Sequence, residues 1–376
     1  MYIYLITFTL SIFIIGLAEK VRLKNKNNKG IKIFYLFIVF IGILLPSILA
    51  GLRDYSIGTD VLVYGNDWFN RAVNTTDFSL YTRWATSSSI GYLYAVFNFV
   101  VSRFTTNPHY FYFYLNFVEG IIVYSAVFRN RDIVSVADGW ATYLCLFYNS
   151  TLNILRNGMA LCILLWGFYY VRNQKFIKYL IVVYIATLFH ATAVMGIIIY
   201  VLYYLIAKNN NSQINKLFTI LVAGLGIIFF QDIGHFLIQN EVISERYSGF
   251  LETNAGGGFI LNLFVFSLPI LILYFKIDFS GVKMNRVFYL LEEIVILATL
   301  LSFLNIVSST VSRINSYFDF FYILAVPYIF NKRVNFKLKE VNLNRIIMYG
   351  YLIIYWMIFY GWMRAGETVP FIFMRS

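Results

Sequence analysis

Apolar residues fill most of this chain in long stretches, and short polar or basic segments separate them. A helix that crosses a membrane needs about 20 mainly apolar residues, and stretches near that length follow one another almost end to end. They lie near residues 2–18, 33–51, 89–105, 109–128, 134–150, 154–171, 177–189, 191–207, 217–231, 259–275, 287–306, 314–331 and 346–362. The pattern predicts an all-α polytopic membrane protein with about 12–13 membrane-embedded helices. It leaves no room for a separate soluble domain, so residues 1–376 are expected to form a single transmembrane domain.

Basic residues gather in short segments between the apolar stretches and set the expected orientation. The segments assigned to the cytoplasm are 20–32, 129–131, 172–178, 208–216, 276–286 and 332–345. The first apolar run is followed by positive charge rather than preceded by it, which indicates a retained helix and not a cleavable signal peptide. The N- and C-termini are then both expected to be extracytoplasmic, with outer loops at 52–88 and 232–258. The net charge of +12 therefore reflects topology, and no nucleic acid is expected as a partner.

Two stretches do not fit this orientation simply. Thirteen crossings would put the termini on opposite sides, so we expect 89–105 to lie as a re-entrant or interfacial helix. The run 177–207 must go out and back in two arms of about 14 residues, each about 21 Å long at 1.5 Å per residue. Such arms are short for a full span, and His190 is expected at the outer tip between them.

Composition supports lipid as the solvent for most of the chain. Apolar residues make up 60 % of the sequence and charged residues only 13 %, and the mean hydropathy is +0.70. Cys145 and Cys162 both lie inside apolar runs, which favours buried small side chains over a disulfide or a metal site. The sequence contains no HExxH, CxxC, GxSxG or DxD motif, so no metal ion and no cofactor is implied.

The distribution of arginine suggests an anionic ligand on the outer side. All 14 lysines lie in the cytoplasmic segments, together with seven of the 16 arginines. The nine remaining basic residues are Arg53, Arg71, Arg83, Arg103, Arg156, Arg246, Arg313, Arg364 and Arg375. A guanidinium presents a planar fork of donors that matches phosphate oxygens and stays charged at any working pH. The alternative is that these arginines pair with acidic neighbours and brace their loops.

The outer loop 52–88 carries the first candidate site. Arg53 follows an apolar helix, where lipid phosphates would lie, and Thr59 or Asp60 is placed to cap a helix over about 61–73. Four residues on that helix recur at spacings of three and four and share one face: Asp60, Tyr64, Asp67 and Arg71. Carboxylates beside aromatic rings suit a sugar, whereas the plainer interpretation is a solvated amphipathic helix on the membrane surface.

Further candidates lie at the outer ends of other apolar segments. Arg156 opens one such helix, where a charge is costly, and His190 stands alone in an apolar run. Arg313 and Tyr317, four residues apart, project from one helix face. Four embedded acids nearer the inner side are expected to make interhelical hydrogen bonds: Glu119, Asp138, Glu292 and Glu293. The glycine run after Asn254 is expected to act as a hinge that lets a lid move.

A set of short motifs follows in a fixed order along the chain: Gly51–Arg53 with Gly58–Asp60 and Tyr64, Leu155–Ala160, Phe176–Lys178, Ala186–His190, Ser312–Phe318, Pro327–Tyr328 and Val369–Phe371. In this order, the motifs resemble the EpsG-type Wzy polymerases of bacterial exopolysaccharide and O-antigen assembly. The resemblance covers most of the chain, and one departure is Asn157 where the family often has glutamine.

The resemblance implies a GT-C-like glycosyltransferase in the bacterial cytoplasmic (inner) membrane, with its active face outside. Donor and acceptor would be undecaprenyl-pyrophosphate-linked oligosaccharides, with a flippase and a chain-length regulator of the same pathway as further partners. Arg156 and Arg313, followed by Arg53, would stabilise the departing pyrophosphate, and Thr59, Tyr64 and Tyr317 would help to bind substrate. His190 or Asp60 would be the general base.

Two other functions remain open on the sequence. An O-antigen ligase would use the same donor but transfer the glycan to lipid A core. A flippase or transporter of lipid-linked oligosaccharide would also use arginines to hold pyrophosphate, but should show polar sites on both sides and often an internal repeat.

Overall fold

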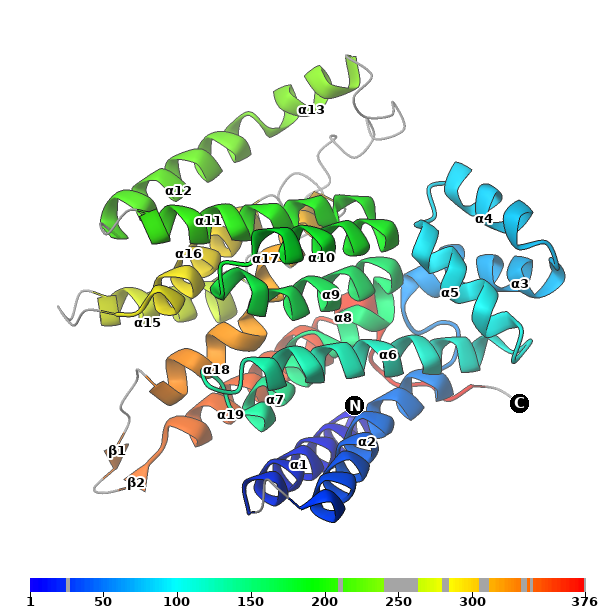
Figure 1. Cartoon of the computed structure of the whole chain (residues 1–376), viewed down its shortest axis with the longest axis horizontal. Helices are drawn as coiled ribbons and strands as arrows, with labels where there is room; N and C mark the ends of the chain where they lie inside the picture. The colour runs from blue at the N-terminus through cyan, green and yellow to red at the C-terminus, as the bar shows by residue number, and fades with distance from the viewer. Residues whose placement is uncertain are drawn as a thin grey trace. The chain divides into compact units, whose positions relative to one another are not determined.

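The computed structural model describes residues 1–24, 28–208, 212–239, 263–278, 284–303, 311–332, 337–338 and 341–374. These residues are helical or irregular, apart from the strands β1 (Lys337–Leu338) and β2 (Val341–Asn342), which pair antiparallel (Figure 1). The chain divides into two compact units. The first holds residues 1–170, 177–194 and 345–376, and the second holds 171–176 and 195–344. The all-α prediction is confirmed, and a single transmembrane domain stays a prediction.

Most helices of the first unit come from the N-terminal half of the chain. They are α1 (Tyr2–Lys24), α2 (Lys29–Leu52), α3 (Asn66–Asn74), α4 (Phe78–Ser87), α5 (Tyr92–Ser102), α6 (Pro108–Arg129), α7 (Val136–Leu146), α8 (Tyr148–Asn153), α9 (Leu155–Arg172), α10 (Phe176–Phe189) and α19 (Asn344–Trp356). A π-helical turn, Val61–Gly65, leads into α3, and further short turns, Met357–Trp362 and Ala365–Glu367, follow α19.

The second unit contains the helices between the short turn Ala191–Gly196 and α19. They are α11 (Ile197–Lys208), α12 (Ser212–Ile228), α13 (Phe230–Gln239), α15 (Leu268–Asp278), α16 (Arg286–Leu301), α17 (Ser316–Asp319) and α18 (Tyr322–Lys332), with the short turns Leu263–Ser267 and Val311–Ile314.

Four helical segments in the described part of the chain are long and apolar enough to cross a membrane. They are Tyr2–Leu23, Lys29–Leu52, Pro108–Arg129 and Ala191–Lys208, and α12 with α13, bent by 64°, makes a possible fifth. This is fewer than the 12–13 embedded helices expected, because several apolar stretches fold as shorter helices. With 11 residues, α5 extends about 16 Å, which agrees with the expectation that 89–105 does not cross fully.

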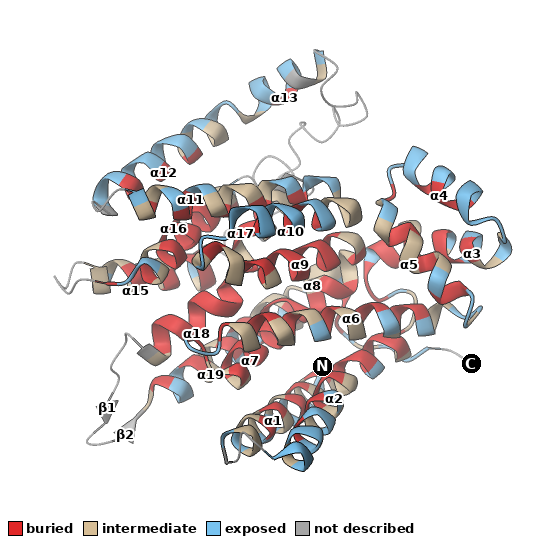
Figure 2. Cartoon of the chain, in the orientation of Figure 1, coloured by how far each residue is buried: buried red, intermediate tan, exposed pale blue. Residues whose placement is uncertain are grey.

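Buried polar links fix the packing around α1. In the first unit α1 packs against α2 and α7, and α2 also packs against α6 (Figure 1). The Ser11 hydroxyl donates to the Gly42 carbonyl at 2.6 Å and accepts from Trp140 Nε1 at 2.8 Å. One small hydroxyl therefore joins α1, α2 and α7. Helix α7 is almost entirely buried, and most of α8 is buried (Figure 2).

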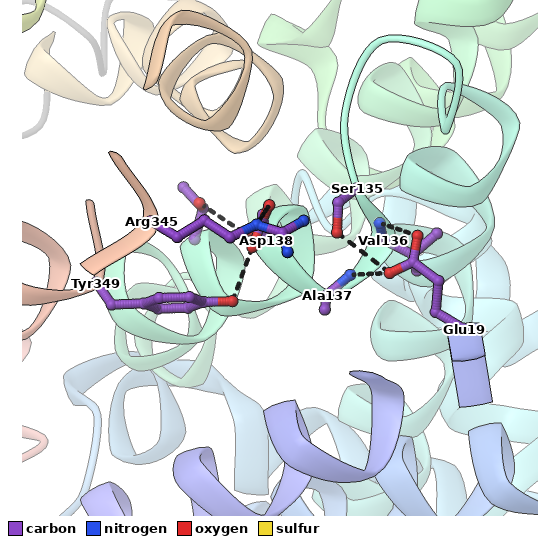
Figure 3. Close-up of polar contacts among 8 residues, drawn as sticks. Glu19, Ser135, Val136, Ala137, Asp138, Arg345 and Tyr349 are labelled. Atoms are coloured by element: carbon purple, nitrogen blue, oxygen red, sulfur yellow. Dashed lines mark hydrogen bonds and ion pairs between the residues drawn. The ribbon is translucent and has the colours of Figure 1, made fainter. Parts of the chain in front are cut away.

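Two carboxylates fasten the start of α7 to neighbouring helices (Figure 3). Glu19 of α1 accepts hydrogen bonds from the Ser135 hydroxyl at 3.1 Å and from the N–H groups of Val136 and Ala137 at 3.3 Å each. The first N–H groups of a helix have no partner within it, and negative charge is favoured there. Glu19 therefore serves as the cap for α7.

Asp138, in the first turn of α7, holds α19 in the same unit. It accepts from Tyr349 Oη at 2.8 Å and from Arg345 Nε at 3.1 Å (Figure 3). The expectation that Asp138 bonds between helices is confirmed. Asp138 is 1 % exposed, so the contacts with Arg345 and Tyr349 satisfy a carboxylate that would be costly to bury alone.

In the second unit α16 packs against α11, α12, α15 and α18. Lys216 of α12 forms ion pairs with Asp278 of α15 and, at 2.9 Å, with Glu292 of α16. The expected interhelical contact of Glu292 is confirmed. Lys216 was expected in a cytoplasmic loop. It lies instead in α12, which begins at Ser212, and is 5 % exposed. A lysine can be buried here because carboxylates on two other helices compensate its charge.

We predict that Glu19→Ala lowers the stability of the protein by about 1–2 kcal/mol, the usual cost of losing a side-chain helix cap. The midpoint of thermal unfolding of the detergent-purified protein should fall by about 2–4 °C per kcal/mol. Glu367→Ala, at an exposed position, is the matched control and should leave the midpoint unchanged. Equal midpoints for the two variants would contradict the cap.

Candidate active site

A break between two helices of the first unit organises the candidate site. Helix α8 ends at Asn153 and α9 begins at Leu155, and Ile154 between them has non-helical angles (φ −90°, ψ 60°). The last carbonyls of a helix lack intrahelical partners. Arg53, 1 % exposed, supplies one partner, because its Nη1 donates to the Leu152 carbonyl at 2.6 Å. The Arg53 guanidinium also lies over the Tyr112 ring at 4.7 Å, so aromatic and carbonyl groups both hold it.

Gly58 brings the following loop against the same carbonyl. Its φ of +87° is readily adopted only by glycine, and a Cβ atom there would lie 2.6 Å from the Leu152 oxygen. Any larger residue would push the loop away from the break. Gly58 therefore explains how Thr59 and Asp60 come to lie beside α8.

Asn153 joins this loop to the break. Its side-chain oxygen accepts from Thr59 Oγ1 at 2.8 Å and from the Asp60 N–H at 3.3 Å. These contacts join residues 94 and 93 positions apart in the chain. Asn153 thus fixes the backbone that carries the Asp60 carboxylate.

The Tyr64 side chain contacts both Asp60 and Arg156. The Tyr64 hydroxyl donates to Asp60 Oδ2 at 2.7 Å, and the Arg156 guanidinium lies over the Tyr64 ring at 4.4 Å. Burial and the nearby Asp60 carboxylate raise the pKa of the Tyr64 phenol above its ordinary value, so the hydroxyl remains a donor at neutral pH. Helix 61–73 was expected and is observed as a π turn followed by α3, but Asp60 accepts from Tyr64 instead of capping it.

Arg156 is held from a third segment. Its Nη1 donates to the Ser89 carbonyl at 2.7 Å, in the turn between α4 and α5. We call the group of Thr59, Asp60, Tyr64, Ser89, Asn153 and Arg156 the Asp60 cluster. Thr59 and Ser89 are exposed, whereas Asp60 is 6 % exposed, so the cluster runs from the surface inward. It combines a carboxylate, a phenol and a guanidinium, which suits both proton transfer and the binding of an anion.

His190 lies next to the same turn. A Cβ atom on Gly91 would lie 2.1 Å from the Phe189 carbonyl oxygen, so only glycine permits this close approach of the turn to the end of α10. His190 follows α10 directly, and its Nδ1 lies 2.7 Å from the Thr192 hydroxyl. The Ser89–Gly91 turn therefore touches Arg156 on one side and the residue before His190 on the other.

The other two predicted site residues belong to the second unit. Arg313 is partly exposed in the turn Val311–Ile314. Tyr317 is fully buried in α17, at 0 % exposure. A shared site with Arg156 remains a prediction for both.

The remaining outer arginines differ in their contacts. Arg71 pairs with Asp67 at 2.9 Å, and Arg103 donates to the carbonyls of Ala72 and Thr75. Arg71 and Arg103 therefore fit the alternative interpretation, in which the outer arginines brace their loops. Arg83 and Arg364 are exposed, while Arg246, Arg375 and the expected glycine hinge after Asn254 lie outside the described residues.

Sequence reasoning missed Asn153, Ser89 and Gly91. The sequence does contain a signal for Asn153. Asparagine recurs every four residues, at Asn149, Asn153 and Asn157, in an apolar run where unpaired amides are costly. Asn149 accepts from Trp356 Nε1 and donates to Thr368 Oγ1, at 2.8 and 2.9 Å. Within the described ranges, no three His, Cys, Asp or Glu side chains are grouped to hold a metal ion.

Comparison with known proteins identifies a family. Searches against curated proteins and against solved structures gave no match. The family model described as "EpsG family" matches residues 35–373, a range that includes the whole Asp60 cluster, His190 and Arg313. Because this match covers nearly the entire sequence, the chain belongs to the EpsG family.

Proposed function

We propose that this protein is a GT-C-like glycosyltransferase that polymerises a polysaccharide. Its substrates are oligosaccharide repeat units on undecaprenyl pyrophosphate, joined at the outer leaflet of the bacterial cytoplasmic membrane, with both chain termini outside. Family membership supports polysaccharide polymerisation. The proposed chemistry rests on the Asp60 cluster. There the Tyr64 hydroxyl donates to the Asp60 carboxylate, and the Arg156 guanidinium lies over the Tyr64 ring.

In the proposed reaction, a hydroxyl oxygen of the acceptor sugar attacks the anomeric carbon of the donor glycan. The bond from that carbon to the pyrophosphate oxygen breaks, and the hydroxyl proton passes to a general base. The lipid pyrophosphate leaves with an additional negative charge. The site must therefore stabilise an anion on one side of the reacting carbon and accept a proton on the other.

Arg156 is placed to stabilise the leaving group. Its contacts with Tyr64 and Ser89 hold the guanidinium in one orientation, and a guanidinium has five N–H donors, so further donors remain for phosphate oxygens. A donor held in place before the reaction stabilises developing charge without reorganisation. Arg313 is the proposed second guanidinium, with Tyr317 supporting it.

Asp60 is our first choice for the general base, and His190 is the second. The Asp60 carboxylate can accept a proton, Tyr64 donates to one of its oxygens, and Asn153 holds its backbone. Thr59, exposed beside it, is available to a sugar hydroxyl. For Arg53, the contact with Leu152 supports a part in building the site, and direct substrate binding stays a prediction.

We predict that Arg156→Lys lowers polymer formation about 10²-fold, the usual scale for losing one preorganised donor. Lysine lacks the planar fork and cannot stack on Tyr64 while also reaching Ser89. The measurement is polymer yield and length from purified protein supplied only with lipid-linked repeat units, normalised to folded protein. Arg83→Lys, at an exposed outer position, is the matched control.

The same assay separates the proposed function from its alternatives. Polymer growth without another acceptor excludes a ligase, and bond formation excludes a flippase acting alone. Full-length polymer from Arg156→Lys would remove the leaving-group role of Arg156.

We predict that Asp60→Asn lowers the rate of polymer formation by about 10²- to 10⁴-fold, the range that general-base catalysis contributes. The amide is nearly isosteric but cannot take up the proton. His190→Gln should retain activity within about tenfold of the unmodified protein, with the rate measured at saturating substrate. The reverse ranking of these two variants would assign the base to His190.

A further inference from the structure

The C-terminal segment, residues 364–374, returns to the part of the chain that carries Arg53 (Figure 1). The Asp54 N–H donates to the Ile372 carbonyl at 2.8 Å, and the Met374 N–H donates to the Leu52 carbonyl at 2.8 Å. Arg53 lies between Leu52 and Asp54, so its backbone is held on both sides as in an antiparallel pair of strands. The C-terminal segment and the end of α2 belong to the same unit.

Helix α8 depends on contacts from other segments to keep its orientation. It has only six residues, and residues with non-helical angles flank it, Phe147 (φ −124°, ψ −21°) and Ile154. A helix this short has little stability of its own, so packing determines how it is rotated about its axis. That rotation matters because Asn153, its last residue, holds Thr59 and Asp60.

Thr368 of the C-terminal segment contacts α8 through Asn149. Both residues are 0 % exposed, and Asn149 Nδ2 donates to Thr368 Oγ1 at 2.9 Å. The oxygen of the same amide accepts from Trp356 Nε1 at 2.8 Å. The Thr368 carbonyl accepts from the Tyr4 hydroxyl at 2.7 Å, so Thr368 joins α8 to α1. Asn149 lies one turn before Asn153, on the same face of α8.

Gly366 of the C-terminal segment lies against Asn153 itself. A Cβ atom on Gly366 would be 3.4 Å from Asn153 Nδ2, which is an ordinary van der Waals distance. The φ angles of Gly366, Arg364 and Glu367 are +69°, +54° and +53°. Such angles are costly for residues other than glycine and persist only where the surrounding structure holds them. This turn is therefore held against the amide whose oxygen binds the loop of Asp60.

We propose that Thr368 is a positioning residue of the candidate site, which sets the rotation of α8 so that Asn153 reaches Thr59 and Asp60. The route runs by a hydrogen bond from Asn149 to Thr368, along one turn of α8 to Asn153, and by hydrogen bonds from Asn153 to the loop. The effect on polymer formation rests on the proposed function, whereas the effect on the loop does not.

Thr368→Val removes the side-chain contact alone. Valine keeps the shape of threonine and the carbonyl that accepts from Tyr4, but it offers no oxygen to Asn149 Nδ2. A buried donor without a partner is costly, so α8 should turn to give Asn149 another partner and so displace Asn153. Thr368→Ser keeps the hydroxyl and should behave like the unmodified protein.

The first readout does not depend on activity. It is the mobility of a nitroxide spin label on Leu62→Cys, in the turn that follows the loop, in detergent-purified full-length protein. Leu62 is 64 % exposed, whereas Cys145 and Cys162 are buried and should not react with the label. Thr368→Val should increase the mobility of the label, and the matched control Thr76→Val, at an exposed position, should not. Unchanged mobility in Thr368→Val would overturn the proposal, whatever the activity.

The second readout is polymer formation, with kcat and KM measured separately. Thr368→Val should lower kcat about 10- to 100-fold and leave KM within about twofold, because a misplaced catalytic group is felt mainly in the transition state. Ser11→Ala is the control for stability, since it removes buried hydrogen bonds among α1, α2 and α7 and should lower the thermal midpoint without lowering kcat. A Thr368→Val variant that loses stability but keeps its kcat would show that Thr368 is structural only.

A double variant tests the route through Asn153. Asn153→Ala should itself lower kcat, and adding Thr368→Val should change it by no more than about twofold, because both substitutions act on the same contact. Losses that multiply would rule out this route. If the unmodified protein forms no polymer, the proposed function is refuted, and the mobility of the spin label still decides whether Thr368 positions the loop.

Discussion

The Leu152 carbonyl at the end of α8 is the constraint on which the first unit's site depends. A helix that stops inside an apolar interior exposes carbonyls that neither lipid nor packed side chains can satisfy. Arg53 meets this need from the end of α2, and Gly58 lets the next loop lie against the same oxygen. Because the break is held in this way, Asn153 can turn its side chain to Thr59 and Asp60. The site thus follows from the way in which the carbonyl at the helix break obtains its hydrogen-bond partner.

Arginine serves more than one purpose on the side of the molecule that was expected to face outward. Arg53 and Arg103 donate to backbone carbonyls, and Arg71 pairs with Asp67. Arg156 shares with Arg53 the pattern of one ring contact and one carbonyl bond, but Arg156 is partly exposed and Arg53 is 1 % exposed. A count of outer arginines therefore overstates the number available to an anionic ligand. Partial exposure, together with a place on the ring of Tyr64, whose hydroxyl donates to Asp60, distinguishes Arg156 from these structural arginines.

Patterns within short stretches of the sequence predicted the features that depend on residues close together in the chain. Hydrophobic stretches predicted the helices, and the four-residue spacing of Asp60 with Tyr64 and of Asp67 with Arg71 predicted that each pair shares a helix face, where the structure has hydrogen bonds between them. The contacts of Asn153 with Thr59 and of Arg156 with Ser89 join distant segments, and no periodicity reveals them. Lys216 was assigned to a cytoplasmic loop because basic residues cluster between the apolar stretches, yet its carboxylate partners lie on two other helices. Helix length was the weakest prediction, since turns divide apolar stretches that look continuous in sequence; the expected segment 314–331, for example, is divided between α17 and α18.

The most direct test of the account is an experimental structure of the protein bound to undecaprenyl pyrophosphate in lipid. Diphosphate oxygens should lie within hydrogen-bonding distance of the Arg156 guanidinium, which should still lie on the Tyr64 ring beside Asp60. A diphosphate bound away from Arg156, with the Asp60 cluster unoccupied, would contradict it.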